Sequence, residues 1–464
     1  MYSNAALKVL GSAKEGDFVQ LQTAERTLGG LLMPKTGSGD ANCIVVKLSS
    51  GYNVGIDAGK IKEVKVVQKA AANENREKAV AGGKGSVEMG AKAGVSEGDF
   101  GNGLISLLGC GGTIASKVEY KTGAVYPASS PQEIVESFPD ISRISKIKSR
   151  VLFQLLSEDM TPKHWGIAAA EAADEIKEGA QGVVLMHGTD TMGYTSAALS
   201  FMLQELPVPV VLTGSQRSTD RPSTDANTNI VCAMHAAKAD IAQVLVCMHK
   251  GMDDSACSLH SGVRVRKMHT SRRDAFVSVN AKPVGEVDAV SGIVRAHGEC
   301  VKRDAGRKLK LFEKVNGNVA LVWVYPGMDG KFVKKLSDFD GVVLAGSGLG
   351  HAPVNAFGAK GANSILPALG KIIEKGTLVA MAPQTIFGRV NMNVYTTGRM
   401  LLEAGVVGNM CDWLPEVAYA KMCWALGQEK NPAKAAELML KNIAGEISER
   451  SEIEKSLWAC VGGF

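Results

Sequence analysis

The chain has 464 residues, few aromatic side chains (5%), and no apolar run long enough to span a membrane. A bilayer span needs about 20 consecutive apolar residues. Residues 1–8 also lack the basic stretch and apolar core of a secretory signal. Charge of either sign is not in large excess, since 52 Lys and Arg stand against 47 Asp and Glu. We therefore expect a soluble cytoplasmic protein whose net charge of +5 does not by itself indicate nucleic-acid binding.

Paired cysteines are also missing. The nine cysteines are odd in number and scattered from Cys43 to Cys460, without a Cys-x-x-Cys pair or the spacing of metal ligands. This usage is typical of a reducing compartment. We expect free thiols and no metal site.

The first 69 residues favour short strands joined by Gly, Asp and Asn turns. A small β-barrel of about five strands would accommodate them. The strand-like segments are residues 17–22, 30–33, 43–48, 52–56 and 64–67.

The composition changes between residues 70 and 102, where Ala, Gly, Lys and Glu dominate. Such a stretch has little apolar surface to bury, so it is predicted to be a flexible linker, with helix near residues 70–81.

Strand-like and helix-like segments alternate after the linker, which favours a parallel α/β sheet with right-handed crossovers. We predict a large α/β domain over residues 103–310, a smaller one over 311–430, and a closing helix with a tail over 431–464. The amphipathic pattern of residues 433–450 predicts one helix. A glycine-rich run at 346–350 lacks the spacing of a dinucleotide site, so no nucleotide cofactor is expected.

Two segments far apart each place a threonine in a tight loop after an apolar strand. Thr113 follows residues 104–108 and a pair of glycines, and Thr189 follows residues 183–186 and Gly188. The carboxyl ends of parallel strands collect ligands, glycines permit close backbone approach, and backbone N–H groups suit a developing oxyanion. The pair of loops indicates hydrolysis of an amide by a threonine nucleophile.

A threonine hydroxyl needs a neighbour that takes up its proton. Asp190 directly follows Thr189, and a lysine held near both can accept or pass on a proton when burial lowers its pKa. Lys267 is the best candidate. A competing interpretation makes it one member of a solvated basic patch formed with Arg264, Arg266, Arg272 and Arg273.

These motifs carry a family resemblance. Gly-Gly-Thr-Ile-Ala at 111–115, His-Gly-Thr-Asp-Thr at 187–191, Thr-Gly-Ser-Gln at 213–216 and Lys267 occur in the order found in bacterial-type L-asparaginases I and II. The longer sequence segments at 117–125 and 213–227 resemble more specifically those of the D subunit of the archaeal-type Glu-tRNA(Gln) amidotransferase. The resemblance covers most of the chain. It implies an asparaginase-like two-domain α/β core that follows the N-terminal barrel in the sequence.

The resemblance also implies roles for individual residues. Thr113 would be the primary nucleophile, and Tyr120, on a mobile flap, would polarise it. Thr189, Asp190 and Lys267 would form a second, activating triad.

Substrate binding is expected from Ser157 and Gly188. Ser157 aligns with a residue that grips the substrate α-carboxylate in asparaginases, although Glu158 stands where many of them carry an amide.

The implied function is that of a glutaminase subunit. It would hydrolyse L-glutamine without a cofactor and supply ammonia to a partner resembling the E subunit, which uses ATP and Mg to convert Glu-tRNA(Gln) to Gln-tRNA(Gln). The tRNA would bind mainly through that partner, and the chain would form a homodimer within a heterotetramer, away from membranes. The alternatives are a free-standing L-asparaginase, which would not need the N-terminal module, and a non-catalytic adaptor, which would not need the complete set of reactive residues.

Two further residues near the threonines have competing interpretations. Cys110 stands where a threonine or another small residue is usual, and it is either a rival nucleophile or a small buried apolar residue. His187 adjoins the Thr189 loop and is either a general base or a structural residue. We favour the structural role for both.

Overall fold

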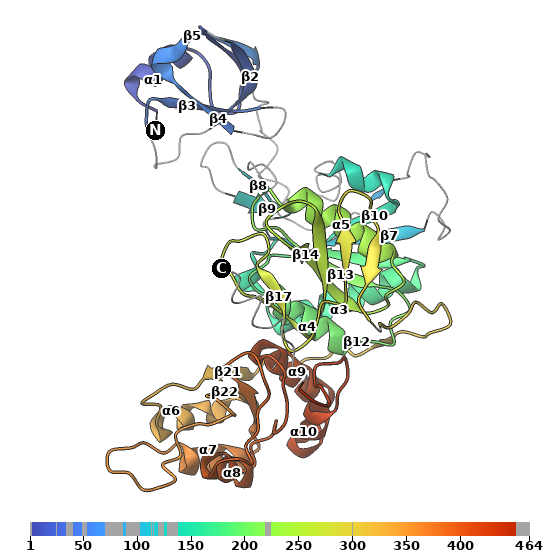
Figure 1. The fold of residues 1–464 in the computed structure, drawn as a ribbon, viewed down its shortest axis with the longest axis vertical. Coiled ribbons are helices and arrows are strands. Elements are labelled where there is room, and N and C mark those ends of the chain that lie inside the picture. The colour runs from blue at the N-terminus through green and yellow to red at the C-terminus, as the bar shows by residue number, and fades with distance from the viewer. Residues whose placement is uncertain are drawn as a thin grey trace.

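A computed structural model describes residues 2–24, 26–33, 40–48, 53–69, 87–89, 103–112, 114, 116–118, 125–127, 138–218, 224–298 and 300–451. Three units follow one another along the long axis (Figure 1). A small β module stands at one end, a large mixed sheet with helices lies in the middle, and a smaller α/β unit lies at the other end.

The N-terminal module is a five-stranded antiparallel sheet in the order β4-β3-β2-β1-β5. In β1, Val19 and Leu21 are fully buried while Gln20 and Gln22 are exposed, which is the alternation expected when one face covers a core. The predicted small β domain is confirmed, and a short helix, α1, was not predicted. The elements are α1 (Asn4–Leu10), β1 (Phe18–Thr23), β2 (Thr27–Leu32), β3 (Cys43–Lys47), β4 (Asn53–Asp57) and β5 (Ile61–Gln68).

Residues 87–89 of the stretch predicted as a linker are described, and they form a strand. β6 (Val87–Met89) pairs antiparallel with β10 (Lys146–Val151) and so extends the edge of the large sheet. The helix predicted near residues 70–81 lies outside the described residues.

The large domain is built on a nine-stranded sheet in the order β19-β18-β15-β14-β13-β11-β7-β10-β6. Five adjacent strands are parallel, as predicted: β7 (Leu104–Gly109), β10, β11 (Gly182–Met186), β13 (Val210–Thr213) and β14 (Val244–His249). Nearly all residues of β7, β11, β13 and β14 are buried, whereas β10 is partly exposed. The strands β15 (Ala256–Ser261), β18 (Gly285–Asp288) and β19 (Val294–Ala296) each pair antiparallel with the strand before them in the sheet. The turn between β14 and β15 is too short for the crossover that a parallel pair needs.

Helices cover both faces of this sheet, as the α/β class requires. α3 (Pro162–Lys177) and α4 (Met192–Met202) pack on one face with Val183 and Leu185 of β11. α5 (Ala226–Lys238) packs on the other face with Val184 and Met186 of the same strand. Alternate side chains of this one buried strand therefore pack into two separate hydrophobic cores, one on each face of the sheet.

The small domain holds a three-stranded parallel sheet, β21 (Val319–Trp323), β22 (Gly341–Gly346) and β23 (Leu378–Pro383), with α6 (Gly330–Lys334), α7 (Leu366–Glu374) and α8 (Thr396–Glu403). The helix α9 (Pro415–Gln428) contacts both β22 and α4. Its buried residues belong to the same apolar cluster as α3 and α4, so a continuous hydrophobic core joins the two domains.

The predicted closing helix over residues 433–450 is wrong beyond Leu440, where α10 (Pro432–Leu440) ends. The carboxylate of Glu446 accepts hydrogen bonds from the backbone N–H groups of Ile443 and Ala444, and Gly445 has a φ of 87°. Because these contacts satisfy the backbone in a turn, the helix does not continue. The same carboxylate pairs with the fully buried ammonium of Lys421 on α9.

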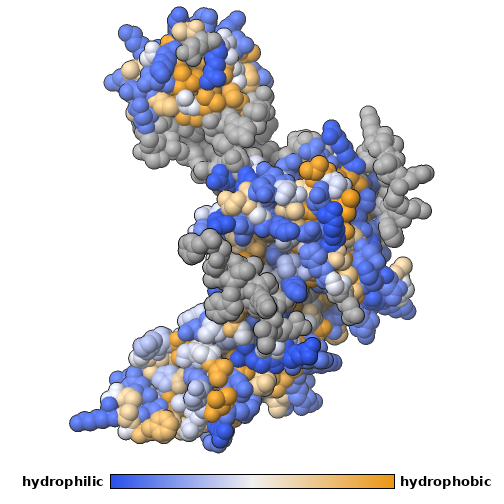
Figure 2. Space-filling view, viewed as in Figure 1, coloured by the Kyte–Doolittle hydropathy of each residue, from blue (hydrophilic) through white to orange (hydrophobic). Residues whose placement is uncertain are grey.

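The described residues also form three short antiparallel strand pairs: β8 (Ser116–Val118) with β9 (Val125–Pro127), β12 (Leu203–Gln204) with β20 (Lys310–Leu311), and β16 (Val265–Lys267) with β17 (Phe276–Ser278). None of the described helices is long and apolar enough to cross a bilayer. Apolar and polar residues are interspersed over the visible face of the molecule (Figure 2).

Candidate active site

The loops that follow β7, β11 and β13 meet at one edge of the large sheet. Gly111 and Gly112 have φ values of 85° and 82°, which favour glycine. A Cβ on Gly112 would lie 2.3 Å from the backbone nitrogen of Gly188, and one on Gly214 would lie 3.0 Å from Cγ2 of Thr189. These approaches leave no space for side chains, so the glycines bring three loops into backbone contact at the carboxyl ends of parallel strands.

Thr189, Asp190 and Lys267 are brought together at this edge. The Nζ atom of Lys267 lies 2.9 Å from Oγ1 of Thr189 and 2.7 Å from Oδ1 of Asp190. Thr189 is buried, the Lys267 side chain is 13% exposed, and that of Asp190 is 67% exposed. Lys267 lies on β16, in a hairpin with β17 that is distant in sequence from Thr189 and Asp190. The lysine can therefore exchange a proton with the threonine hydroxyl while the carboxylate balances its charge.

Thr113 and Tyr120 lie outside the described residues. Gly112, which precedes Thr113, lies against Gly188, and β8 and β9 flank the sequence segment that contains Tyr120. The roles of both residues stay predictions.

Ser157 and Gly188 are in contact. Ser157 begins a short 3-10 helix, η4 (Ser157–Asp159), and is buried. A Cβ on Gly188 would lie 2.7 Å from Cβ and 2.9 Å from Oγ of Ser157, and the Thr191 hydroxyl donates to the Ser157 carbonyl at 2.7 Å. Glu158 is exposed. The serine thus borders the Thr189 loop.

Of the four arginines beside Lys267, Arg264 and Arg266 are paired with carboxylates of the small domain, whereas Arg272 is exposed. Arg264 is 4% exposed, and its guanidinium lies 3.1 Å from the carboxylate of Asp412. Arg266 lies 3.0 Å from Glu416 at the start of α9. These acidic partners were not predicted, because they stand about 150 residues away, where no local pattern marks them. The two pairs fasten the strand that carries Lys267 to the small domain.

The two residues with competing interpretations are both buried. The ring of His187 is hydrogen-bonded at both nitrogens, to the Gly188 carbonyl at 2.7 Å and to the Thr195 hydroxyl at 2.9 Å, and burial lowers its pKa to about 4. Burial raises the pKa of the Cys110 thiol to about 12, which disfavours the nucleophilic thiolate. These surroundings support a structural role for each.

Comparisons with known proteins agree with this geometry. Residues 104–299 match the family described as Asparaginase, N-terminal, residues 318–439 match Glutaminase/Asparaginase C-terminal domain, and residues 13–67 match GatD N-terminal domain. The D subunit of glutamyl-tRNA(Gln) amidotransferase from Methanothermobacter thermautotrophicus is 43% identical over 457 residues, 97% of this chain and 98% of that protein. The chain belongs to the D-subunit family of glutamyl-tRNA(Gln) amidotransferases. The resemblance found in the sequence is confirmed.

Other members and neighbours of the D-subunit family support the same conclusion. The D subunit from Pyrococcus abyssi is 41% identical over 449 residues, covering 95% of this chain and 97% of that protein. Among solved structures, the thermostable L-asparaginase from Thermococcus kodakarensis has a TM-score of 0.64 and 31% identity, and L-asparaginase I from Vibrio cholerae has 0.63 and 27%. Each covers 75% of this chain and 100% of its own. The asparaginase-like core with a preceding β domain is therefore confirmed.

In this member of the D-subunit family, the described residues contain no cluster of three or more His, Cys, Asp or Glu side chains that could hold a metal ion. Eight of the cysteines fall in the described part of the chain, and all eight are free thiols.

Proposed function

We propose that this chain is the glutaminase subunit of a Glu-tRNA(Gln) amidotransferase. The proposal rests on the contact of the Lys267 ammonium with both Thr189 and Asp190. Gly112, which precedes Thr113 in the chain, lies against Gly188 in the same loop as Thr189. Family membership supplies the context, because the related proteins are named as subunits of that amidotransferase.

In this reaction the hydroxyl oxygen of Thr113 attacks the side-chain amide carbon of L-glutamine, and ammonia leaves with a proton. Water then hydrolyses the resulting ester, which releases glutamate and restores the hydroxyl. Thr189, Asp190 and Lys267 serve as the activating group that moves the protons, and Tyr120 polarises Thr113. Ser157 and Gly188 hold the α-carboxylate of the substrate.

The ammonia passes to a partner of the E type, which uses ATP and Mg to activate glutamate on tRNA(Gln) and amidates it. The glutaminase step itself uses no cofactor. Two copies of this chain would pair within a heterotetramer in the cytoplasm, where charged tRNA is found.

The test is ammonia release from L-glutamine and L-asparagine by the purified chain, with and without a matching E-type partner, ATP, Mg and Glu-tRNA(Gln). Stimulated release together with formation of Gln-tRNA(Gln) is expected. Hydrolysis should be nearly lost in folded Thr113→Ala and Thr189→Ala. Activity kept in Cys110→Ser would exclude the cysteine as nucleophile. An inactive but folded Cys110→Ser would overturn the assignment of Thr113.

A free-standing L-asparaginase is the second candidate, because solved L-asparaginases share this core. Rapid asparagine hydrolysis by the isolated chain, indifferent to the partner and tRNA, would establish it. The N-terminal module favours the amidotransferase, since residues 13–67 match a domain described as GatD N-terminal domain.

A further inference from the structure

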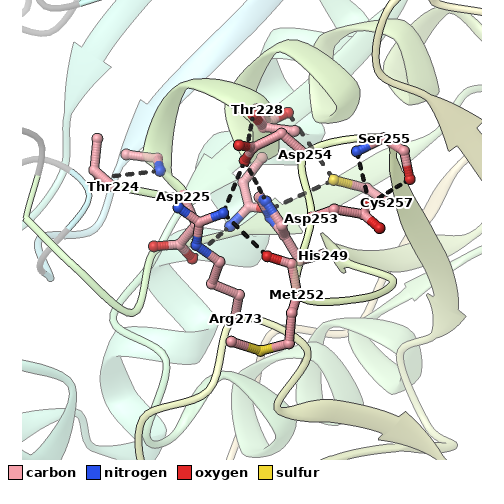
Figure 3. A network of polar contacts seen from close by, with 12 residues as sticks. Thr224, Asp225, Thr228, His249, Met252, Asp253, Asp254, Ser255, Cys257 and Arg273 are labelled. Atoms are coloured by element: carbon pink, nitrogen blue, oxygen red, sulfur yellow. Dashed lines mark hydrogen bonds and ion pairs between the residues drawn. The ribbon is translucent and has the colours of Figure 1, made fainter. Parts of the chain in front are cut away.

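Figure 3 shows a network of polar contacts that includes Asp225, His249, Asp254 and Arg273. The fully buried carboxylate of Asp225, at the start of α5, accepts hydrogen bonds from the backbone N–H groups of Gln216, at 2.9 and 3.0 Å, and Arg217, at 3.1 Å. These residues follow Gly214, which packs against Thr189. Asp225 therefore fixes the loop that borders one member of the triad.

Asn229 extends the network from Asp225, and its neighbours fix the orientation of its amide. Its Nδ2 atom donates to Oδ2 of Asp225 at 3.0 Å and to the carbonyl of Gly214 at 2.9 Å, both of which only accept. Its Oδ1 atom must then face the other side, where Nδ1 of His249 lies 2.6 Å away and the thiol of Cys257 donates at 3.4 Å. The Nδ1 atom of His249 is consequently a donor.

The second ring nitrogen of His249 also faces an acceptor. Its Nε2 atom lies 3.0 Å from Oδ1 of Asp254, and the guanidinium of Arg273 donates to the same oxygen at 3.1 Å. Burial opposes ionisation of Asp254, but its hydrogen bond to His249 and the nearby charge of Arg273 prevail and lower its pKa. An ionised carboxylate only accepts hydrogen bonds, so Nε2 is a donor as well. A histidine that donates from both nitrogens is an imidazolium cation.

We propose that His249 is held as a buried cation and acts as a positioning residue, linking the Asp225-held loop beside Thr189 to the β16–β17 hairpin that carries Lys267. Arg273 supplies the hairpin end of the link, because it lies in the turn between these two strands. The inference rests on the proposed function, since it concerns the alignment of Thr189 with Lys267.

The remaining groups around His249 are compatible with a cation. Asp253 adds negative charge near His249, while Arg273 adds positive charge beside Asp254. Burial raises the pKa of the Cys257 thiol, which stays a neutral donor to Asn229. His249 itself is 1% exposed, and both of its ring nitrogens face protein partners.

The protonation state can be measured without activity. In the full chain labelled with ¹⁵N at histidine, the His249 ring signals are assigned by their loss in His249→Gln. Two protonated ring nitrogens at pH 7 are expected for His249, and conversion of Asp254 to Asn should return the ring to a neutral tautomer with one proton. A neutral ring in the wild-type protein would overturn the proposal.

The positioning role is tested by kinetics of glutamine hydrolysis in the assembled complex with Glu-tRNA(Gln). Arg273→Met removes the contact between the hairpin and Asp254 and keeps a side chain of similar length. We expect kcat to fall about tenfold to a hundredfold while KM changes little. Arg273→Lys should recover most of the rate. Met248→Ala, a neighbouring core change on β14, is the control for lost packing alone.

The outcomes separate this inference from the proposed function. Equal rates in Arg273→Met and the wild type, with a wild-type complex that forms Gln-tRNA(Gln), would overturn the link but leave the glutaminase intact. A wild-type complex that releases no ammonia would instead overturn the proposed function, and the ring protonation would still decide whether His249 is a cation.

Discussion

The Nζ atom of Lys267 lies 2.9 Å from the hydroxyl oxygen of Thr189, although 78 residues separate them in the chain. The contact depends on two structural units, the loop after β11 and the hairpin β16–β17. The loop is positioned by a buried parallel strand, and the hairpin is fastened to the small domain through Arg264 and Arg266. The candidate triad is therefore sensitive to the packing between the domains as well as to its own side chains.

Removing the ammonium should abolish most of the reaction. In Lys267→Met, kcat for glutamine hydrolysis is expected to fall about 10²-fold to 10⁴-fold, because a positioned acid or base contributes a factor of this size. The measurement is ammonia release by the assembled complex at saturating glutamine. Lys250→Met is the matched control, since Lys250 is an exposed lysine that pairs with Glu286. A Lys267→Met enzyme as active as the control would contradict the proposed role.

The close approach of Gly188 to Ser157 gives a second prediction. Gly188→Ala would place its Cβ 2.7 Å from Cβ of Ser157 and push apart the two loops. Because a displacement of about 1 Å can cost a hundredfold in rate, we expect a loss of that order in kcat/KM for glutamine.

Gly251→Ala is the control for Gly188→Ala, since its added Cβ would meet nothing within 4 Å in the described structure. It should retain wild-type kinetics and stability. Similar kcat/KM values in the two variants would show that the Ser157 loop tolerates displacement and does not define the site.

The buried pair of Arg264 and Asp412 predicts a loss of stability. Arg264→Met leaves the Asp412 carboxylate, 3% exposed, without its guanidinium partner. Breaking a buried pair from one side costs about 3–5 kcal/mol, so the free energy of unfolding should fall by that amount in urea titrations. Arg272→Met, which breaks a more exposed pair with Asp274, should cost less than about 1 kcal/mol. Equal urea midpoints for the two variants would show that the Arg264–Asp412 pair does not stabilise the fold.

The sequence predicted the strands and glycine loops of the site because their signals are local. Apolar runs bounded by glycine identified β7 and β11, and the order of motifs through Lys267 identified the family. It also anticipated that Thr189, Asp190 and Lys267 would meet. Roles assigned to Thr113 and Tyr120 stay predictions, because both lie outside the described residues.

What the sequence did not predict depends on distant contacts. The pairing of Arg264 and Arg266 with Asp412 and Glu416 has no local signature, so the basic run was open to interpretation as a solvated patch. The end of α10 at Leu440 was missed because the apolar period continues beyond it. There Glu446 binds backbone N–H groups and Lys421, and these tertiary contacts override the helical pattern.

Two buried neutral histidines should make the protein less stable in acid. Burial lowers the pKa of His187 and of His260 from 6.5 to about 4. Between these values the unfolded chain binds a proton that the folded chain does not, so stability rises with pH and is lost as pH falls from about 6.5 towards 4. Each histidine should account for about 2 kcal/mol of lost stability between pH 7 and pH 5.

The share of one histidine can be isolated with His260→Asn, in which the amide replaces Nδ1 opposite the Ser278 hydroxyl, 2.8 Å away in the wild type. Urea unfolding at pH 7 and pH 5 should show a pH-dependent loss smaller than that of the wild type by about 2 kcal/mol. His269→Asn removes an exposed histidine and provides the comparison. If the His260→Asn and wild-type losses were equal, protonation of His260 would not oppose folding. The acid sensitivity would then have to arise from His187 or from the carboxylates.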